Sequence, residues 1–292
     1  RSLDTGDDVR VVCTGYQVPR TADPHDSWNQ TATRIWFDLP EAVSAGQSHD
    51  DCYLYYGNPA ATDPPDRWSD SMGYYLPGEI FVTGEDFERS ADGADPRGWT
   101  DQGTDDWRVR IHDDDRWFSP PALGDWQNGS VATSMADVAD ASWSAELYYW
   151  QAGDNGWGGL AARVEHGGGV IVLIQDRRYY LTTEYWIEPT VQWTDNEDIH
   201  FPHGSKGRVE IVTLGSTATV YWHNPVGFSP RRVTIIEDWA LGSAAGKLAV
   251  FAERPSETNQ RWINVDDVIV RRFVSPEPTV SLGCEEQPVP GP

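Results

Sequence analysis

A long succession of short strand patterns is the feature that most constrains the fold of this 292-residue chain. Between residues 79 and 272, about a dozen segments rich in β-branched and aromatic residues follow one another, separated by turns of Gly, Pro, Asn and Asp. Ala145, Leu147 and Tyr149 alternate with other residues, as is typical of a strand with one buried face. No long amphipathic helix pattern occurs. We therefore predict an all-β chain in which residues 79–283 form an antiparallel β-sandwich of the jelly-roll kind.

Residues 1–59 predict a second, much smaller unit. Its strand candidates are residues 8–13, 33–39 and 51–56. Because so few strands cannot cover a core of their own, we expect a small, incomplete β-domain whose sheet is completed by strands from elsewhere. Residues 60–78, rich in Pro, Asp and Ser, are typical of a linker, and the proline-rich residues 284–292 predict a tail.

The charge of the chain excludes one class of partner. A formal net charge of −24 repels the phosphate backbone, so nucleic acid is not expected to bind. No stretch approaches the ~18 continuous apolar residues that a membrane-spanning helix needs. The 15 tryptophans and 12 tyrosines suit a sandwich core and also surfaces on which sugars stack.

The three cysteines divide into a pair and a single residue. Cys13 ends one strand candidate and Cys52 begins another, so a disulfide between neighbouring strands is predicted. Disulfides of this kind are typical of proteins outside the cell or at its surface. Cys284 is left for a contact with another chain or with a cysteine that precedes residue 1. The triplets that begin at Asn29 and Asn128 are candidate glycosylation sites.

Two acidic segments stand at the two ends of the predicted sandwich. GEDFE contains Glu85, Asp86 and Glu88, and INVDDV contains Asp266 and Asp267. The first and last strands of a jelly roll commonly lie side by side, and buried neighbouring carboxylates repel unless a proton or a cation neutralises them. We therefore predict a structural Ca²⁺ whose main ligands are Glu88 and Asp267, with the other three carboxylates contributing. The alternative is a set of solvated turn residues.

A glycine-rich segment, GDNGWGG, presents Trp157 beside Asp154 and Asn155. A ring in such a turn is difficult to bury in a core. Beside polar side chains it suits a sugar, which stacks on the ring and forms hydrogen bonds through its hydroxyls. Tyr185 and Trp186 extend this candidate ligand-binding surface. The alternative is that Trp157 packs over a sheet edge or against a neighbouring subunit.

The sequence lacks the signatures of common hydrolases. It contains no G-x-S-x-G elbow, no H-E-x-x-H and no C-x-x-C motif. The E-x-D-x-x-E pattern of lectin-like glucanases is also missing, because Glu184 and Glu188 lack the middle acid. No catalytic residue is therefore assigned, and we expect a protein that is not an enzyme.

Both parts of the chain resemble known families. Residues 1–60, with DDVRVV, TRIWFDLP and YLYYGNP, resemble the later half of a surface β-domain without an assigned function, found in large secreted proteins of bacteria and archaea. Members of that family carry about a strand pair more before the DDVRVV strand. The remainder, with GEDFE and NVDDVIVRRFVSPEPTVSLG, resembles the concanavalin A-like lectin/glucanase (laminin-G-like) module. The resemblance implies a β-sandwich and a surface location, and it supplies no catalytic residue.

The expected function is therefore that of a non-enzymatic extracellular or cell-surface module, stabilised by calcium, that binds carbohydrate or mediates adhesion. An alternative is a structural subunit of an extracellular filament or sheath, in which copies of the chain exchange strands. The incomplete first unit, Cys284 and the proline-rich tail favour this alternative. A polysaccharide-cleaving enzyme is less favoured because the sequence identifies no pair of carboxylates that flanks a cleft.

Overall fold

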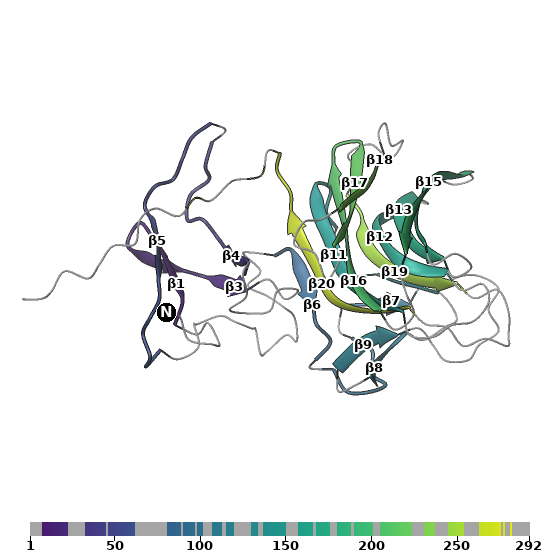
Figure 1. Cartoon of the computed structure of the whole chain (residues 1–292), viewed down its shortest axis with the longest axis horizontal. Helices are drawn as coiled ribbons and strands as arrows, with labels where there is room; N and C mark the ends of the chain where they lie inside the picture. Colours follow the sequence, from purple (N-terminus) through teal and green to yellow (C-terminus); the bar gives the residue numbers. More distant parts are fainter. Residues whose placement is uncertain are drawn as a thin grey trace, which may run out of the picture.

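A computed structural model gives the fold, which consists of strands alone in the part of the chain that it describes (Figure 1). This part contains twenty strands, β1 to β20, and the all-β prediction is confirmed. None of its residues forms a helix long and apolar enough to cross a membrane. The described residues are 8–22, 33–44, 46–61, 81–88, 90–96, 98–101, 107–112, 115–119, 130–133, 137–149, 157–165, 168–175, 180–187, 190–200, 205–223, 231–236, 245–253, 263–275, 277 and 281.

The first five strands form two small sheets. One has the order β2-β1-β5, and the other pairs β3 with β4. The strands are β1 (Arg10–Cys13), β2 (Tyr16–Val18), β3 (Arg20–Ala22), β4 (Ile35–Phe37) and β5 (Cys52–Tyr55). The sequence predicted β1, β4 and β5 but not β2 and β3, so this unit has more strands of its own than expected. Most of the predicted linker lies outside the described residues, and the domain boundaries stay a prediction.

A tight turn and a disulfide fix the three-stranded sheet. Thr14 and Gly15, which join β1 to β2, have φ angles of 50° and 83°. Two positive φ values in a two-residue turn give it the same twist as the strands that it joins. Cys13 and Cys52 lie directly opposite each other on β1 and β5 and form a disulfide, which confirms the predicted pairing.

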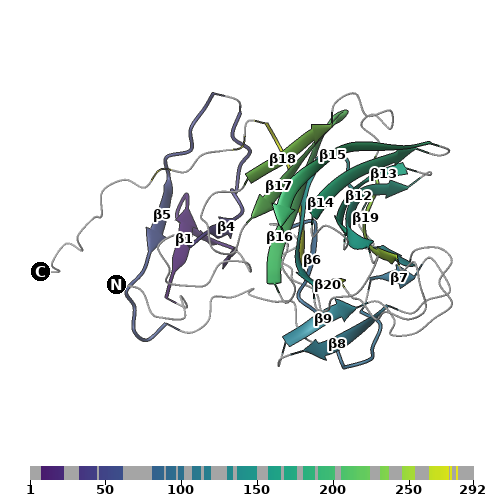
Figure 2. The same cartoon turned by 45° about the vertical axis from the view of Figure 1, so that its right-hand side comes forward.

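The remaining strands form two large antiparallel sheets that pack face to face (Figure 2). The seven-stranded sheet contains, in order, β15 (Thr190–His200), β14 (Tyr180–Ile187), β13 (Gly168–Gln175), β12 (Trp157–Glu165), β19 (Lys247–Glu253), β10 (Ser130–Thr133) and β7 (Thr100–Asp101). The eight-stranded sheet contains β18 (Arg231–Ile236), β17 (Thr217–His223), β16 (Ser205–Leu214), β11 (Ala141–Tyr149), β20 (Ile263–Arg272), β9 (Asp115–Ser119) and β8 (Arg108–His112), with β6 (Thr83–Glu85) also paired to β20.

The core lies between these two sheets and follows the alternation of the strands. On β11, Ala145 and Leu147 are completely buried, while Glu146 and Tyr148 between and after them remain partly exposed. Strands β16, β17 and β19 contribute alternate residues in the same way. The pairing of β6 with β20 confirms that the first and last strands of the sandwich are neighbours.

One arginine ties the two sheets together at an end of the sandwich. Arg163 of β12 is almost fully buried, and its Nε donates to the carbonyl of Ala139 at 2.6 Å. One of its terminal nitrogens donates to the carbonyl of Gly215 at 2.7 Å, and the other reaches Asp140 at 3.1 Å. These bonds connect the seven-stranded sheet with the start of β11 and the β16–β17 turn. Each of the three nitrogens thus donates a hydrogen bond, which compensates for the burial of this cation.

The small sheets contact the sandwich through Trp36 of β4. Its ring packs edge-on against Phe81, with centroids 6.2 Å apart, in an apolar cluster that also contains Ile269 of β20. The guanidinium of Arg271, also on β20, lies 4.9 Å from the centroid of the Trp36 ring. A cation above an indole face is attracted by the ring quadrupole. The outer face of the eight-stranded sheet is therefore partly covered by the small unit.

Loss of the disulfide is expected to destabilise the small unit alone. Replacing Cys13 and Cys52 by Ser should cost about 2 to 4 kcal/mol, because the cross-link spans 39 residues and restricts the unfolded chain. Hydrogen exchange followed by mass spectrometry should show faster exchange in residues 8–22 and 46–61 than in the wild type. Equal acceleration in the strands of the sandwich would contradict this expectation.

Candidate functional site

A β-bulge interrupts the pairing of β20 with β11. Ser144 of β11 lies opposite Ile269, whereas Glu146 lies opposite Asp266, so β20 has one residue more than β11 between these rows. Asp267, inside the bulge, has a φ of 45°. A non-glycine residue in this left-handed region is uncommon and often marks a functional or strained position.

The bulge changes which side chains of β20 face the core. Val265 and Val268 both belong to the core cluster, although residues three apart would face opposite sides of a regular strand. Because β20 has one extra residue at the bulge, the side chain of Val268 again faces the core. As a consequence, the adjacent Asp266 and Asp267 both lie on the outer face, where they meet a third carboxylate.

Glu146, Asp266 and Asp267 form what we call the carboxylate cluster. One oxygen atom of each lies within 4.8 Å of the others. Asp266 is only 5% exposed, and the other two are partly buried. The backbone N–H of Asp267 donates to Oδ1 of Asp266 at 2.8 Å, which orients the more buried carboxyl group. Three carboxylates this close repel strongly when all are ionised.

The pKa values of the cluster reflect this repulsion. Burial raises the pKa of Asp266 well above its ordinary value of 3.8, and the charge of Asp267 raises it further. The charges of Asp115 and Glu146 act in the same direction, whereas the backbone N–H of Asp267 acts against them. Burial also raises the pKa of Glu146, with the charge of Lys206 opposing and that of Asp115 adding. The site therefore favours a bound proton or a bound cation.

Lys206 neutralises part of this negative charge. Its Nζ lies 3.0 Å from Asp115, 3.8 Å from Glu146 and 4.3 Å from the centroid of the Trp117 ring. Partial burial lowers the pKa of Lys206, but the hydrogen bond with Asp115 and the charge of Glu146 raise it overall, so the ammonium is retained. One ammonium cannot balance Asp115 and the three carboxylates of the cluster.

Asn264 supplies a further polar group on the same face. It precedes Asp266 by two residues on β20, and it is completely buried. Within the described part of the chain, neither its Oδ1 nor its Nδ2 has a hydrogen-bond partner. A buried amide without a partner is costly and indicates a water or an ion beside it. Trp117 and Tyr148, with ring centroids 5.3 Å apart, pack nearby against Lys206.

The carboxylates predicted from the first acidic segment have other partners. Glu88 accepts the backbone N–H of Arg116 at 2.8 Å and pairs with its guanidinium at 3.1 Å. Glu85 accepts the backbone N–H of Phe87 at 2.9 Å, and Asp86 accepts that of Glu88 at 3.3 Å. The structure therefore joins Asp266 and Asp267 to a residue that the sequence analysis did not propose as a ligand.

That residue is Glu146. The sequence predicts which face of its strand Glu146 occupies, but not which residue lies opposite it. The alternation of residues 143–151 places Glu146 on the polar face of its strand, as the structure confirms. Its position opposite Asp266 depends on the antiparallel register of β11 and β20, which are separated by more than a hundred residues. No local pattern encodes that register.

A second polar network lies on the same outer face, centred on Glu210 of β16. Its carboxylate accepts a hydrogen bond from Ser142 at 2.5 Å, lies 2.7 Å from Nε2 of His223 and pairs with Arg271 at 3.4 Å. Burial acts to raise the pKa of Glu210. The hydrogen bond with His223, the charge of Arg208 and the hydrogen bond with Ser142 overcome it and lower the pKa below the usual range.

Register places several aromatic residues on the outer face of the seven-stranded sheet. Leu160 and Ala162 of β12 belong to the core, so residues at odd spacing from them occupy outer positions. Through the pairing of neighbouring strands, the outer positions include Trp157 of β12, Tyr180 and Trp186 of β14, and Trp193 of β15.

One row of this face, which we call the aromatic row, crosses five strands. It runs through Glu253, Trp157, Gln175, Tyr180 and His200. Of its members, the sequence analysis proposed Trp157 as a sugar-binding residue. The row becomes visible only when the ladder pairings are known, because its members are far apart in the chain.

The predicted sugar-binding residues do not form one compact group. Trp186 shares the outer face with Trp157, but its row lies six residues from that of Tyr180, about 20 Å along the strand. Tyr185 shares a row with Ala162, on the core side of the sheet. Asp154, Asn155, the candidate glycosylation sites Asn29 and Asn128, and Cys284 lie outside the described residues.

No protein-family model and no curated protein matches the sequence. Similar solved structures include the mixed-linkage glucan GH16 protein of Bacteroides ovatus in complex with a G4G4G3G product. It is 9% identical to this chain, with a TM-score of 0.50, and the alignment covers 65% of this chain and 99% of that chain. The carbohydrate-binding module CBM66 of Bacillus subtilis is similar at 12% identity, with 60% and 95% covered and a TM-score of 0.45. The β-glucanase of Bacillus licheniformis is similar at 8% identity, with 65% and 97% covered and a TM-score of 0.48.

At these identities the likeness concerns the fold, and of the three structures described the Bacteroides ovatus structure, with a TM-score of 0.50, supports it. The larger part of the chain is an antiparallel jelly-roll β-sandwich, as predicted. The resemblance proposed for residues 1–60 stays a prediction.

Glu210→Gln is expected to destabilise the protein by about 3 kcal/mol at pH 7, because it removes a buried carboxylate that holds an imidazole and two guanidinium groups. A lowered pKa in the folded state stabilises the protein at pH values above 4.5, and this contribution is lost as the pH falls. Urea unfolding from pH 7 to pH 3 should therefore show the variant and the wild type converging. Glu88→Gln, in an exposed ion pair with Arg116, is the control and should change stability by less than about 1 kcal/mol.

Proposed function

We propose that the protein is a non-enzymatic, extracellular carbohydrate-binding module that binds a glycan chain on the outer face of the seven-stranded sheet. The aromatic row carries this proposal. Indole and phenol rings stack on the apolar faces of sugars, while carboxylate, amide and imidazole groups exchange hydrogen bonds with sugar hydroxyls. A row that crosses five strands suits an extended polymer better than a single sugar.

The fold and the disulfide support this proposal at a coarser level. The Bacteroides ovatus protein holds a glucan product on the same general scaffold. Because a shared fold does not fix function, the residues of the row carry more weight than the likeness. The disulfide between Cys13 and Cys52 is consistent with an oxidising, extracellular location.

A binding role is favoured over cleavage by the burial of the carboxylate cluster. Glu146 and Asp266 are close enough to act as a pair, and the rings of Trp117 and Tyr148 lie nearby. However, Asp266 is 5% exposed and Trp117 is 1% exposed. A glycosidic bond must lie between the two carboxyl groups to be cleaved, and a sugar cannot reach side chains that are this deeply buried.

We assign the carboxylate cluster to a structural cation, with Ca²⁺ as the best candidate. Ca²⁺ takes six to eight oxygen ligands with loose geometry, and carboxylates, amide oxygens, backbone carbonyls and water all serve. The cluster offers three carboxylates, and Asn264 offers an amide oxygen that has no hydrogen-bond partner among the residues that the structure describes. A cation there would relieve the repulsion that raises the pKa of Asp266 and would fix the bulge of β20.

Asp266→Asn tests the cation directly. A raised pKa means that the folded state prefers the protonated carboxyl, so the stability it contributes is lost as the pH rises through that pKa. In EDTA at pH 7 the variant should therefore unfold at a higher temperature than the wild type. With millimolar Ca²⁺ the order should reverse, because the wild type gains a ligand and the variant does not.

The control is Glu88→Gln, which removes a carboxylate outside the cluster. Its melting temperature should respond to Ca²⁺ as that of the wild type does. Equal melting temperatures of the wild type in EDTA and in Ca²⁺ would reject the cation site. A Ca²⁺ response that Glu88→Gln abolishes would instead support the ligand set predicted from the sequence.

Trp157→Ala tests the glycan-binding face. Affinity gel electrophoresis in Ca²⁺ against soluble β-glucan, xylan, mannan and alginate should identify a retarding polysaccharide. Loss of one stacked ring should weaken its binding by about tenfold. Tyr221→Ala, on β17 of the other sheet, should leave binding unchanged. Failure of the wild type to bind any of a broader glycan panel would contradict the proposal.

A further inference from the structure

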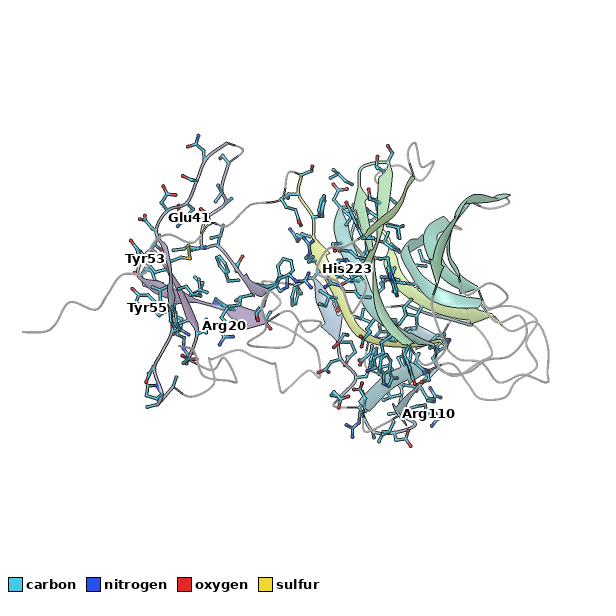
Figure 3. The ribbon with its side chains drawn as sticks, viewed as in Figure 1. Arg20, Glu41, Tyr53, Tyr55, Arg110 and His223 are labelled. Carbon is cyan, nitrogen blue, oxygen red and sulfur yellow. A yellow bond between two sulfur atoms is a disulfide. The ribbon has the colours of Figure 1, made fainter. Side chains whose placement is uncertain are left out.

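Strand β5 presents two tyrosine rings on the side of the small sheet that faces away from the sandwich (Figure 3). Tyr53 is 49% exposed and Tyr55 is 55% exposed. Their ring centroids are 6.5 Å apart, and the ring planes are inclined by 45°. Two residues apart on one strand, they project from the same face of the sheet.

The opposite face of the sheet is the one that packs on a core. Val11, Cys13 and Val18 are buried there and pack with Phe37 and Leu39. The two tyrosines are therefore not part of this core. A sheet face that leaves aromatic rings half-exposed beside a complete inner core is a candidate binding surface.

Polar residues surround the two rings. Val12 lies opposite both Gln17 and Tyr53 in the ladder, and Arg10 lies opposite Tyr55. Gln17 is exposed, while Arg10 and Val12 are half-buried. We call these five residues the tyrosine face. It offers two stacking rings together with hydroxyl, amide and guanidinium groups that form hydrogen bonds.

The backbone beneath the rings is held at both ends. The disulfide joins the start of β5 to β1, and the backbone N–H of Gly57, just after the strand, donates to the buried carboxylate of Asp8 at 2.5 Å. Side chains on a fixed strand lose less entropy when they bind than side chains on a mobile loop. The arrangement is therefore suited to recognition.

We propose that the tyrosine face is a second carbohydrate-binding site, which stacks sugar rings of a glycan chain on Tyr53 and Tyr55. It goes beyond the proposed function because it lies in the other part of the chain and uses none of the residues of the aromatic row. In a chain of net charge −24, none of its five residues is acidic and one is cationic, so it accepts neutral or acidic sugars.

The size of the surface distinguishes a glycan from a protein partner. A stable protein interface buries about 800 Å² on each partner. Two half-exposed rings, one exposed amide and two half-buried residues on a three-stranded sheet offer much less than that. A sugar ring, in contrast, needs little more than one aromatic ring and a few hydrogen-bonding groups. The tyrosine face therefore fits a glycan better.

The test uses the full chain with Tyr53 and Tyr55 both replaced by Ala. The background is Trp157→Ala, so that the aromatic row contributes as little as possible. Tyr16→Ala is the matched control, because Tyr16 is 77% exposed and lies opposite Cys13, on the other face of the same sheet. A second variant with both tyrosines replaced by Phe keeps the rings, and a cooperative thermal transition at the wild-type temperature shows that each variant is folded.

Affinity electrophoresis against the polysaccharides named above is the readout, with sedimentation velocity in parallel. We expect each lost ring to weaken the residual binding by about tenfold, with little change for the Phe variant and none for Tyr16→Ala. Unchanged binding after loss of both rings, an equal loss in Tyr16→Ala, or no binding at all in the Trp157→Ala background would overturn the proposal. A change in oligomeric state without a change in glycan binding would instead make the face a protein interface and also overturn it.

The same experiment separates the two glycan-binding proposals. If Trp157→Ala binds as the wild type does while loss of both tyrosines abolishes binding, the aromatic row fails and the tyrosine face is supported. Replacement of both tyrosines with Trp157 intact completes the set, and unchanged binding of that variant together with loss of binding in Trp157→Ala supports the aromatic row alone.

Discussion

The pairing of β20 with β11 at the centre of the eight-stranded sheet is the constraint on which the rest of the structure depends. The bulge at Asp267 lets Val265 and Val268 both reach the core, and it directs two adjacent carboxylates outward beside Glu146. The same strand pairs with β6, which closes the sandwich between its first and last strands. Without the bulge, Asp267 would face the core between the two sheets, like Val265, and burial of its carboxylate there would cost several kcal/mol.

The outer faces of the two large sheets follow different physical rules. On the eight-stranded sheet, Glu210 and the carboxylate cluster are buried and charged, so each needs compensation by hydrogen bonds, cations or protons. On the seven-stranded sheet, the aromatic row combines rings with neutral and acidic groups across five strands. Stability therefore depends strongly on the charges of the first face, whereas the glycan binding that we propose concerns the second.

The small unit is joined to the sandwich by few but specific contacts. Trp36 lies against Phe81 and Ile269 and under the guanidinium of Arg271, which also pairs with Glu210. The polar network of the sandwich thus continues into the contact with the small unit. With the tyrosine face on its far side, the small unit would add a second point of attachment to the same polymer, and linked sites bind more tightly than either alone.

The sequence by itself determined the all-β class, most strands, the neighbouring positions of the first and last strands, and the disulfide. These depend on alternation, turn residues and cysteine position, which are local signals. Strands β7, β9 and β15 of the sandwich were not predicted. Strand β7 has two residues, and the polar segments DRWFS and TVQWTDNEDIH do not carry a clear apolar alternation.

Only the tertiary structure decided which acidic residues meet. Glu88, which the sequence analysis proposed as a main ligand, pairs with Arg116, whereas Glu146 joins Asp266 and Asp267. The reason is that a site built across strands depends on register. Register is set by long-range pairing and by a single bulge, and a shift of one residue would move every side chain of β20 to the other face.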